Sequence, residues 1–435
     1  MAVFLKRLHH VTLHVSNVEK IAYDLVSKFK FNLFASRLTD KSRQLAFRKG
    51  TAVFVVNERK GGLNEKKKGW CNQHGDSPVC LYDVDLHHSV DTVSNVCFEV
   101  EDVKRSFKVL GQLGCHFVVP PTEVEDDHGV VTYSVVKSVV GNVCHTLLDR
   151  TKYEGPFLPG FDVTEEEEEG WGLEEHHVST CPITHFDHIT YACPRKSTNQ
   201  VMRWYEKHFG FQRFFIDSNE DVEGGFVINQ QGIGLRLTAM EYWKCSRAGI
   251  ILPSVEKSEP DCKFVIAESL PEQGSNQVDT FLEQHRSPGI QHIGLYTKNI
   301  LSTAQSMAEA GVRFFSPPPA YYTEVGKQQE IEEAGHSPQM LAQHGILLDT
   351  DLHQVLTSPS GSNENRRYLL QVFTKPIFAE DTFFLELIER RGATGFGEGN
   401  IRALWRSVQA YMENENERSR SPEESSPKTM QTNQF

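Results

Sequence analysis

Two histidines and one glutamate stand where their side chains could bind one metal ion together. His188 in "FDHITYAC" and His292 in "GIQHIGLYT" have the same place in a frame of apolar, polar, His, β-branched, small and apolar residues. Glu386 in "DTFFLELIERRG" has apolar neighbours, where a carboxylate is costly to bury unless it is paired or bound to metal. Each residue alone is more typical of an ordinary core position, but together they form the facial triad of non-haem Fe(II) oxygenases. We therefore predict one Fe(II) per chain.

The two histidine segments belong to a frame that occurs four times. Its copies are "RLHHVTLHV" (7–15), "VSNVCFEV" (93–100), "FDHITYAC" (186–193) and "IQHIGLYT" (290–297). Each copy precedes an amphipathic stretch of helical period, which short alternating strand runs follow. Self-similarity of this kind indicates a repeated structural unit. We predict an α+β protein of four βαβββ modules that pair into two half-barrel domains. This arrangement resembles the vicinal-oxygen-chelate fold, whose cups hold a divalent metal.

The domain boundaries follow from the modules and from an acidic run, "EEEEEGWGLEE" (165–175), which is typical of a solvated linker. The last residues are polar and rich in Ser and Pro, which is typical of disorder. We predict an N-terminal domain without a metal site (7–150), a linker (151–183), a C-terminal catalytic domain (184–392), a C-terminal gating helix (393–412) and a disordered tail (413–435).

The N-terminal half lacks the three candidate ligands. Its second copy of the frame has Asn95 in place of histidine, and its closing strand, "GNVCHTLLDR" (141–150), has Thr146 where Glu386 stands. A cup that offers only His10 would bind metal weakly. We therefore interpret this half as structural, and His9, His10 and His14 as ordinary strand histidines.

The third module adds no further ligand. We place its closing strand at "GIGLRLTAM" (232–240), which contains no acid and no imidazole. The metal would keep three open positions, enough for a bidentate α-keto acid and O₂. Asp187, next to His188, is predicted to lie on the opposite face of the strand, in solvent.

Three segments resemble the 4-hydroxyphenylpyruvate dioxygenase family: "YLLQVFTKP" (368–376), "TFFLELIERRGATGFGEGN" (382–400) and "PGIQHIGLYT" (288–297). The resemblance covers about residues 7 to 410. It places the family's iron ligands on the same three residues that the frame predicts. It also implies substrate-binding glutamines at Gln277, Gln291 and Gln371, aromatic residues around the ring at Phe373, Phe384 and Phe396, and a closing lid that contains Asn400 and Trp405.

The chain departs from the family at three pocket positions. Ala267 replaces an Asn, Leu237 replaces a Ser and Ile401 replaces a Phe. The hydroxymandelate synthases related to this family also have aliphatic residues in place of the Asn and the Phe. The resemblance therefore implies conversion of 4-hydroxyphenylpyruvate to 4-hydroxymandelate, because a smaller wall lets the intermediate turn its benzylic carbon toward the oxidant.

Two other functions remain open at this point. The chain could form homogentisate, as the dioxygenases do. It could also be a metal- and ligand-binding protein without turnover, since the loss of polar pocket groups weakens substrate binding. Retention of all three ligands and three glutamines favours an enzyme.

Composition limits the partners. The net charge is −13, without a basic stripe, so no nucleic-acid partner is expected. No apolar run approaches the ~18 residues of a membrane span. The nine cysteines form no CxxC pair, which is typical of reduced thiols inside cells. The N-terminus has no acid before Glu19, as in a mitochondrial targeting segment, but "LHHVTLHV" also fits the first strand of the fold, and both interpretations hold if the segment is not cleaved. We expect a mitochondrial location, with the cytoplasm as the alternative. The expected partners are an aromatic α-keto acid and O₂, with a homodimer implied by the resemblance.

Overall fold

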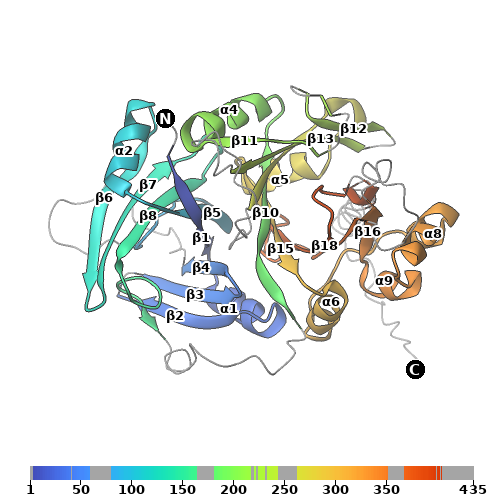
Figure 1. Ribbon diagram of the computed structural model, residues 1–435, viewed down its shortest axis with the longest axis horizontal. Coiled ribbons are helices and arrows are strands. Elements are labelled where there is room, and N and C mark those ends of the chain that lie inside the picture. The colour runs from blue at the N-terminus through green and yellow to red at the C-terminus, as the bar shows by residue number, and fades with distance from the viewer. Residues whose placement is uncertain are drawn as a thin grey trace, which may run out of the picture.

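The computed structural model describes residues 3–40, 42–58, 80–163, 181–216, 220–221, 224–230, 233–242, 262–350, 367–397, 399–401 and 403. These residues form two curved, mixed sheets, one in each half of the chain. Figure 1 shows the N-terminal half, blue to teal, beside the C-terminal half, green to red. The predicted acidic run, tail and Trp405 lie outside the described residues. None of the described helices is long and apolar enough to span a membrane.

The N-terminal sheet has the strand order β6-β7-β8-β5-β1-β4-β3-β2-β9. Its first module consists of β1 (Leu5–Val15), α1 (Val18–Tyr23), a π-helical turn (Asp24–Lys28), β2 (Asn32–Leu38), β3 (Arg43–Lys49) and β4 (Ala52–Glu58). Its second module consists of β5 (Thr92–Val100), α2 (Val103–Gln112), β6 (Phe117–Asp126), β7 (Gly129–Lys137) and β8 (Cys144–Tyr153). The two frame strands, β1 and β5, are antiparallel neighbours at the centre of the sheet.

The C-terminal sheet repeats this plan with the order β11-β13-β14-β10-β15-β18-β17-β16, and β12 pairs with β13. Its third module consists of β10 (Ile183–Cys193), α4 (Thr198–Phe209), β11 (Phe211–Phe214), β12 (Phe226–Gln230), β13 (Ile233–Tyr242) and β14 (Lys263–Ser269). A 3₁₀ turn (Pro271–Gln273) and α5 (Gln277–His285) lead to the fourth module. That module consists of β15 (Gly289–Thr297), α6 (Ile300–Glu309), β16 (Leu347–Thr350), β17 (Tyr368–Phe373) and β18 (Phe384–Arg391).

The register confirms that the four copies of the frame are equivalent. In each module the frame strand runs parallel to the closing strand, as β1 with β4, β5 with β8, β10 with β14 and β15 with β18. The predicted closing strand of the third module was therefore wrong, because the described residues of that segment, 233–240, belong to β13 and the closing strand is β14. Glu386 pairs with Gly294 of β15, and its counterpart Val265 of β14 pairs with Thr190. The conclusion that this module offers no ligand still holds.

Two further predictions need correction. The predicted linker began too early: β8 runs to Tyr153, β9 (Asp162–Val163) pairs with β2, and Phe157 is buried in the N-terminal core. The fourth module also contains three helices between its frame helix and its strands: α7 (Ala320–Thr323), α8 (Val325–Glu333) and α9 (Pro338–His344). These helices are short, and α8 has only Ile331 buried, so the apolar periodicity is too weak to predict them.

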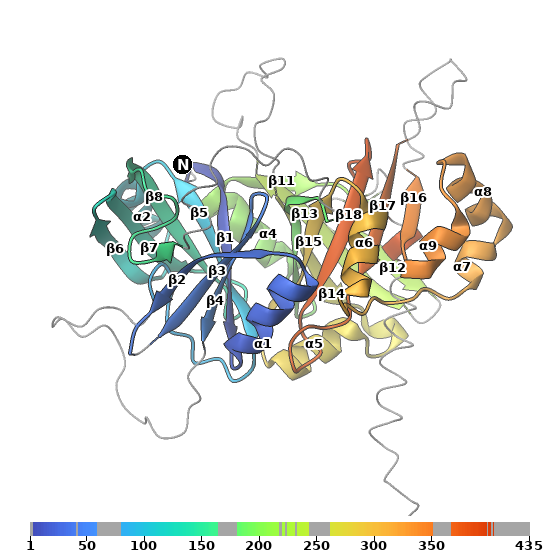
Figure 2. The ribbon, with the colours of Figure 1, turned by 90° about the horizontal axis from the view of Figure 1, so that it is seen from below.

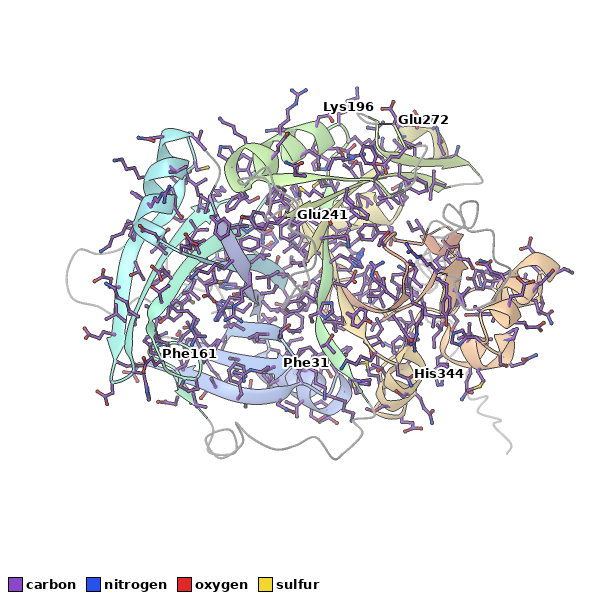
Figure 3. The ribbon with its side chains drawn as sticks, in the orientation of Figure 1. Phe31, Phe161, Lys196, Glu241, Glu272 and His344 are labelled. Carbon is purple, nitrogen blue, oxygen red and sulfur yellow. The ribbon has the colours of Figure 1, made fainter. Side chains whose placement is uncertain are left out.

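The two halves share one hydrophobic core. The ring centroids of Phe54 and Phe186 lie 5.1 Å apart across the boundary, and the backbone N–H of Thr51 donates to the carbonyl of Thr184 at 2.6 Å. Figure 2 shows the two halves packed side by side. In Figure 3, Phe31 is a buried side chain and Lys196 an exposed one. The ring centroid of Phe31 lies 5.3 Å from that of Phe54. The close contact holds the two sheets in a fixed relation.

Candidate metal centre

His188, His292 and Glu386 meet in the C-terminal cup. One donor atom from each lies within 4.8 Å of the other two. Oε2 of Glu386 lies 3.1 Å from Nε2 of His188 and 3.8 Å from Nε2 of His292, and all three side chains are largely buried. The donors come from three adjacent strands, β10, β15 and β18. Two imidazole nitrogens and a carboxylate oxygen that converge in this way fit a divalent metal.

Asp187 holds the imidazole of His188 in place. The register of β10 with β15 shifts between Phe186 and His188. Such a bulge interrupts the alternation of side chains between the faces of a strand. Oδ1 of Asp187 lies 2.9 Å from Nδ1 of His188, and both side chains are buried. The prediction that Asp187 lies in solvent was therefore wrong. This contact puts the ring proton on Nδ1 and leaves Nε2 for a metal.

Arg390 completes this arrangement on the other side of Asp187. Its guanidinium donates two hydrogen bonds of 2.8 Å, from Nε and Nη2, to the two carboxylate oxygens of Asp187. Burial raises the pKa of Asp187, but the charge of Arg390 and the hydrogen bonds outweigh it and hold the pKa well below its usual range. Asp187 is therefore a carboxylate that can only accept from His188.

Glu386 is held by a chain of amides. Nε2 of Gln371 donates to Oε1 of Glu386 at 2.8 Å and to the carbonyl of Phe396 at 3.2 Å. Nδ2 of Asn400 donates to Oε1 of Gln371 at 2.9 Å, and the hydroxyl of Tyr321 lies 2.9 Å from Oδ1 of Asn400. Both amide hydrogens of Gln371 are thus used, so its geometry fits positioning of Glu386 better than direct contact with a substrate.

His292 is supported by stacking. Phe384 is its neighbour in the parallel ladder of β15 and β18, and the two rings stack at 4.7 Å with an interplanar angle of 18°. Burial and the charge of His188 lower the pKa of His292 well below its usual value, so this imidazole is neutral and able to bind a metal.

Gly294 makes room for His188. A Cβ atom at Gly294 would lie 2.4 Å from Cε1 of His188, which is closer than real atoms approach. Because Asp187 fixes the ring, the ring has little freedom to move aside. The absence of a side chain at Gly294 on β15 therefore leaves the space that the ring of His188 on β10 occupies.

Comparison with known proteins identifies the family. The model described as Glyoxalase/Bleomycin resistance protein/Dioxygenase superfamily matches residues 185–336. The chain is 42% identical over 414 residues to the 4-hydroxyphenylpyruvate dioxygenase-like protein of Homo sapiens, covering 94% of this chain and 98% of the relative. It is 30% identical over 326 residues to the 4-hydroxyphenylpyruvate dioxygenase of Yarrowia lipolytica, covering 73% of this chain and 72% of the relative. The chain belongs to the 4-hydroxyphenylpyruvate dioxygenase family.

A solved structure confirms the fold. A mutant of 4-hydroxymandelate synthase from Streptomyces coelicolor superimposes with a TM-score of 0.66 at 21% identity, covering 95% of this chain and 100% of that one. The predicted vicinal-oxygen-chelate fold is therefore confirmed.

The cleft of this 4-hydroxyphenylpyruvate dioxygenase family member opens beside the triad. Most residues predicted to bind substrate line it: Gln277, Gln291, Gln371, Phe373, Phe396, Ile401, Ala267 and Leu237. Phe384 is not among its lining residues, because the ring stacks behind His292. Asn400 is fully buried and reaches the cleft only through Gln371.

Thr190 is a cleft residue that sequence reasoning missed. It lines the cleft beside the triad, and its buried hydroxyl has no hydrogen-bond partner in the described part of the chain. A buried hydroxyl without a partner is costly, so an oxygen of a ligand or a water molecule would be well placed there. Its place two residues after His188 in the frame could have indicated it.

In the N-terminal cup, other residues stand at the three positions equivalent to the triad. The register makes His10, Asn95 and Thr146 the counterparts of His188, His292 and Glu386. Nδ2 of Asn95 donates to the hydroxyl of Thr146 at 2.7 Å, and this hydroxyl donates to the carbonyl of Tyr82 at 2.7 Å. The side chains of Asn95 and Thr146 are therefore both hydrogen-bonded to the carbonyl of Tyr82, which supports a structural role for these positions.

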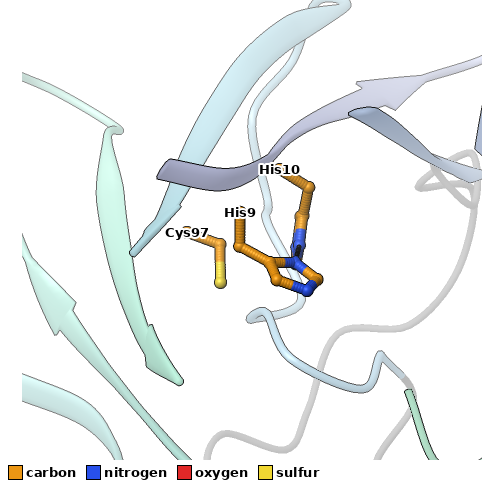
Figure 4. Close-up of side chains that lie close together, drawn as sticks. All are labelled: His9, His10 and Cys97. Atoms are coloured by element: carbon orange, nitrogen blue, oxygen red, sulfur yellow. Dashed lines mark hydrogen bonds between the residues drawn. The ribbon is translucent and has the colours of Figure 1, made fainter. Parts of the chain in front are cut away.

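A second cluster in the N-terminal half brings together His9, His10 and Cys97 (Figure 4). Nδ1 of His9 lies 2.8 Å from Nδ1 of His10, which is a hydrogen-bond distance. Burial raises the pKa of Cys97 well above its usual value, so this sulfur is a neutral thiol. The two imidazoles already satisfy each other through this hydrogen bond, which favours the structural role predicted for both histidines.

Proposed function

We propose that this protein uses Fe(II) and O₂ to convert 4-hydroxyphenylpyruvate to 4-hydroxymandelate and CO₂. In this reaction one oxygen atom enters the carboxylate that remains after loss of CO₂, and the other enters the benzylic carbon. Iron, when bound, supplies the activation of O₂. The two histidines and one glutamate of the triad would hold it, since a neutral His292, an oriented His188 and a buried Glu386 suit a divalent cation.

The cleft would orient the keto acid. Its carboxylate end would lie at the triad, where Gln291 on β15 and the hydroxyl of Thr190 offer hydrogen-bond donors. Its ring would lie against Phe373 and Phe396, whose buried rings line the cleft. Two aromatic walls fix the plane of a phenyl ring with little loss of entropy.

The observation that carries the choice of product is the apolar wall of the cleft. Ala267, Leu237 and Ile401 all line it, and none can donate or accept a hydrogen bond through its side chain. Leu237 and Ala267 face each other as cross-strand partners on β13 and β14. These three positions therefore offer the phenol no hydrogen bond. The arylacetate intermediate can then present its benzylic C–H to the oxidant.

A product assay tests this proposal. The purified protein is loaded with Fe(II) without oxygen, mixed with 4-hydroxyphenylpyruvate and exposed to O₂, and the products are identified by mass and retention time. We expect 4-hydroxymandelate as the main product. Homogentisate as the main product would agree with the proposed iron site but contradict the role of the apolar wall. Bound iron without O₂ uptake would favour a ligand-binding protein.

Two variants control the assay. His292→Ala removes a ligand and should lose both bound iron and product. Asn95→Ala changes the counterpart of His292 in the N-terminal cup and should keep both. Iron content, measured by elemental analysis, separates loss of the metal from loss of turnover. The expected mitochondrial location and homodimer remain predictions.

A further inference from the structure

Tyr321 lies at the far end of the amide chain that holds Glu386. It belongs to α7, which the fourth module inserts together with α8 and α9 between its frame helix and its strands. Figure 2 shows these three helices at the outer edge of the C-terminal half, on the side of β16. Tyr321 is not among the residues that line the cleft. The function proposed above assigns it no part.

The residues after β18 return to the sheet and end the chain of contacts to Gln371. We call the described ones, 396–397 and 399–401, the closing segment. Phe396 and Ile401 line the cleft, whereas Asn400 is fully buried and donates to Gln371. The position of the closing segment therefore sets both a wall of the cleft and the contact that reaches Gln371.

Two glycines let the closing segment approach the sheet. A Cβ atom at Gly397, which has a φ of +73°, would lie 2.5 Å from Oε1 of Gln371 and 3.2 Å from Nδ2 of Asn400. A Cβ atom at Gly399 would lie 2.6 Å from Oδ1 of Asp349 on β16. The backbone N–H of Gly399 donates to Oδ2 of the same carboxylate at 3.1 Å. Larger side chains at these two positions would collide with the groups that the segment contacts.

The direction of each hydrogen bond in the chain follows from the one before it. The carbonyl of Phe396 can only accept, so the amide nitrogen of Gln371 faces it and Oε1 of Glu386. Oε1 of Gln371 then needs a donor, which is Nδ2 of Asn400. Oδ1 of Asn400 needs a donor in its turn, and the hydroxyl of Tyr321 supplies it at 2.9 Å.

The backbone of Leu348 on β16 holds the hydroxyl of Tyr321. The N–H of Leu348 donates to the hydroxyl oxygen at 3.0 Å, and the carbonyl of Leu348 lies 2.8 Å from it. Nζ of Lys327 donates to this carbonyl at 3.1 Å, so the carbonyl has a donor when the hydroxyl proton points to Asn400. Burial holds the pKa of Tyr321 well above its usual value, so the hydroxyl keeps the proton that it donates.

The ring of Tyr321 is also held in place. It packs against a buried cluster that contains Phe315, Phe373 and Phe384. Phe384 in turn stacks on the ring of His292. A hydroxyl on a ring that is packed in this way has little freedom to move, so it offers Asn400 a donor at a fixed point.

We propose that Tyr321 is a positioning residue for the metal ligand Glu386, acting through Asn400 and Gln371. With Oε1 of Glu386 held by Gln371, Oε2 is left to face the two imidazoles, at 3.1 and 3.8 Å from their Nε2 atoms. Without the hydroxyl of Tyr321, the buried Oδ1 of Asn400 loses its donor, which is unfavourable, and the amide would turn and release Gln371. This inference rests on metal binding at the triad, as proposed above.

The first experiment compares Tyr321→Phe with Tyr322→Phe. The two tyrosines are neighbours on α7, and the hydroxyl of Tyr322 donates to the carbonyl of Ile346 at 2.9 Å, outside the chain to Glu386. Each variant loses one hydrogen-bonded hydroxyl, so urea should unfold both more easily than the unchanged protein. Only Tyr321→Phe should lower the affinity for Co(II), by about tenfold, in calorimetry without oxygen. The visible absorption of bound Co(II) reports the geometry of its ligands and should change in Tyr321→Phe alone.

The outcomes separate this inference from the proposed function. Equal Co(II) affinity and an equal spectrum in Tyr321→Phe and the unchanged protein would overturn the role of Tyr321 and leave the metal site intact. An equal loss of affinity in Tyr321→Phe and Tyr322→Phe would also overturn it, because general loosening of α7 would then explain the effect. If the unchanged protein binds no Co(II), both the inference and the proposed function fail.

A double-mutant cycle tests whether the effect passes through Asn400. Asn400→Ala alone should lower Co(II) affinity about tenfold or more, since Gln371 loses its donor. Adding Tyr321→Phe to Asn400→Ala should lower the affinity no further, because the oxygen to which the hydroxyl donates is already gone. Full affinity in Asn400→Ala, or losses that add up in the double variant, would show that Tyr321 does not act through this chain.

Discussion

Asp187 in the C-terminal half has the same place as His9 in the N-terminal half. Both precede a frame histidine at a shift in register, and both touch its Nδ1, at 2.9 Å from Asp187 to His188 and at 2.8 Å from His9 to His10. The consequences differ because the carboxylate of Asp187 can only accept a hydrogen bond, so the proton stays on Nδ1 of His188. Between the two imidazoles of His9 and His10, either nitrogen can carry the one proton that they share. Only the carboxylate fixes Nε2 as a metal ligand.

Replacing Asp187 with Asn should therefore weaken metal binding. We expect a loss of metal affinity of about 10- to 100-fold, because the ring of His188 loses its charged anchor. Stability should fall by about 3 kcal/mol or more, since Arg390 is left as an unpaired buried charge. Anaerobic calorimetry and urea unfolding measure the two effects.

Asp83→Asn is the matched control for this prediction. Asp83 is a buried carboxylate that lies 2.9 Å from Nε2 of His14 in the N-terminal cup. Its replacement should lower stability while metal affinity stays unchanged. Equal metal affinity in Asp187→Asn and the unchanged protein would contradict a role for Asp187 in holding the ligand.

The repeated frame explains why the triad and the four modules could be predicted. The positions of His188, His292 and Asn95 follow from one periodic pattern, and the register places them as that pattern requires. Strands that differ from the pattern could not be predicted equally well. β14 was missed as a closing strand because "KFVIAES" carries no frame residue that distinguishes it from β13.

The contacts that support the triad could not be predicted from the sequence. Asp187 was assigned to solvent because regular alternation puts neighbouring side chains on opposite faces, and a bulge cannot be recognised from alternation alone. The contact between Asn400 and Gln371 joins residues 29 positions apart, and Tyr321 comes from α7, a helix of 4 residues that is too short to show an apolar period. Such contacts depend on tertiary packing.

Gly294→Ala should disturb the metal site without touching a ligand. The added Cβ would meet the ring of His188 at 2.4 Å, and Asp187 keeps that ring from turning away. We expect metal affinity to fall about tenfold or more. Gly326→Ala is the control, because a Cβ there meets nothing within 4 Å. Unchanged metal affinity in Gly294→Ala would show that the ring adapts and that the glycine is dispensable.

Metal binding should release a proton from His188. Burial lowers the pKa of this imidazole, but Glu386 and Asp187 outweigh burial and raise it to about 9 in the metal-free protein. A histidine must be neutral to bind metal. At about pH 7.5 we therefore expect about one proton released per metal ion, with affinity falling as the pH drops. Calorimetry in two buffers of different ionisation enthalpy counts the protons, and a count of zero would contradict the raised pKa.

The same group should make the stability of the metal-free protein depend on pH. Because the folded pKa of about 9 lies above the usual value of 6.5, the contribution of His188 to stability is fully present below about pH 6.5. It is lost as the pH rises through about 9. Urea unfolding across this range measures the loss, and Asp187→Asn, which removes one of the charges that raise the pKa, should reduce it.

Ile401→Phe tests whether the wall of the cleft selects the product. A phenyl ring at this position is larger than the sec-butyl group and would fill space beside Phe396 and Leu237, which line the same cleft. The intermediate should then rotate less, so the share of homogentisate should rise at the expense of 4-hydroxymandelate. Ile401→Leu conserves volume and should leave the product ratio unchanged. If Ile401→Phe binds iron normally and yields the ratio of the unchanged protein, the wall at Ile401 does not steer the oxidation.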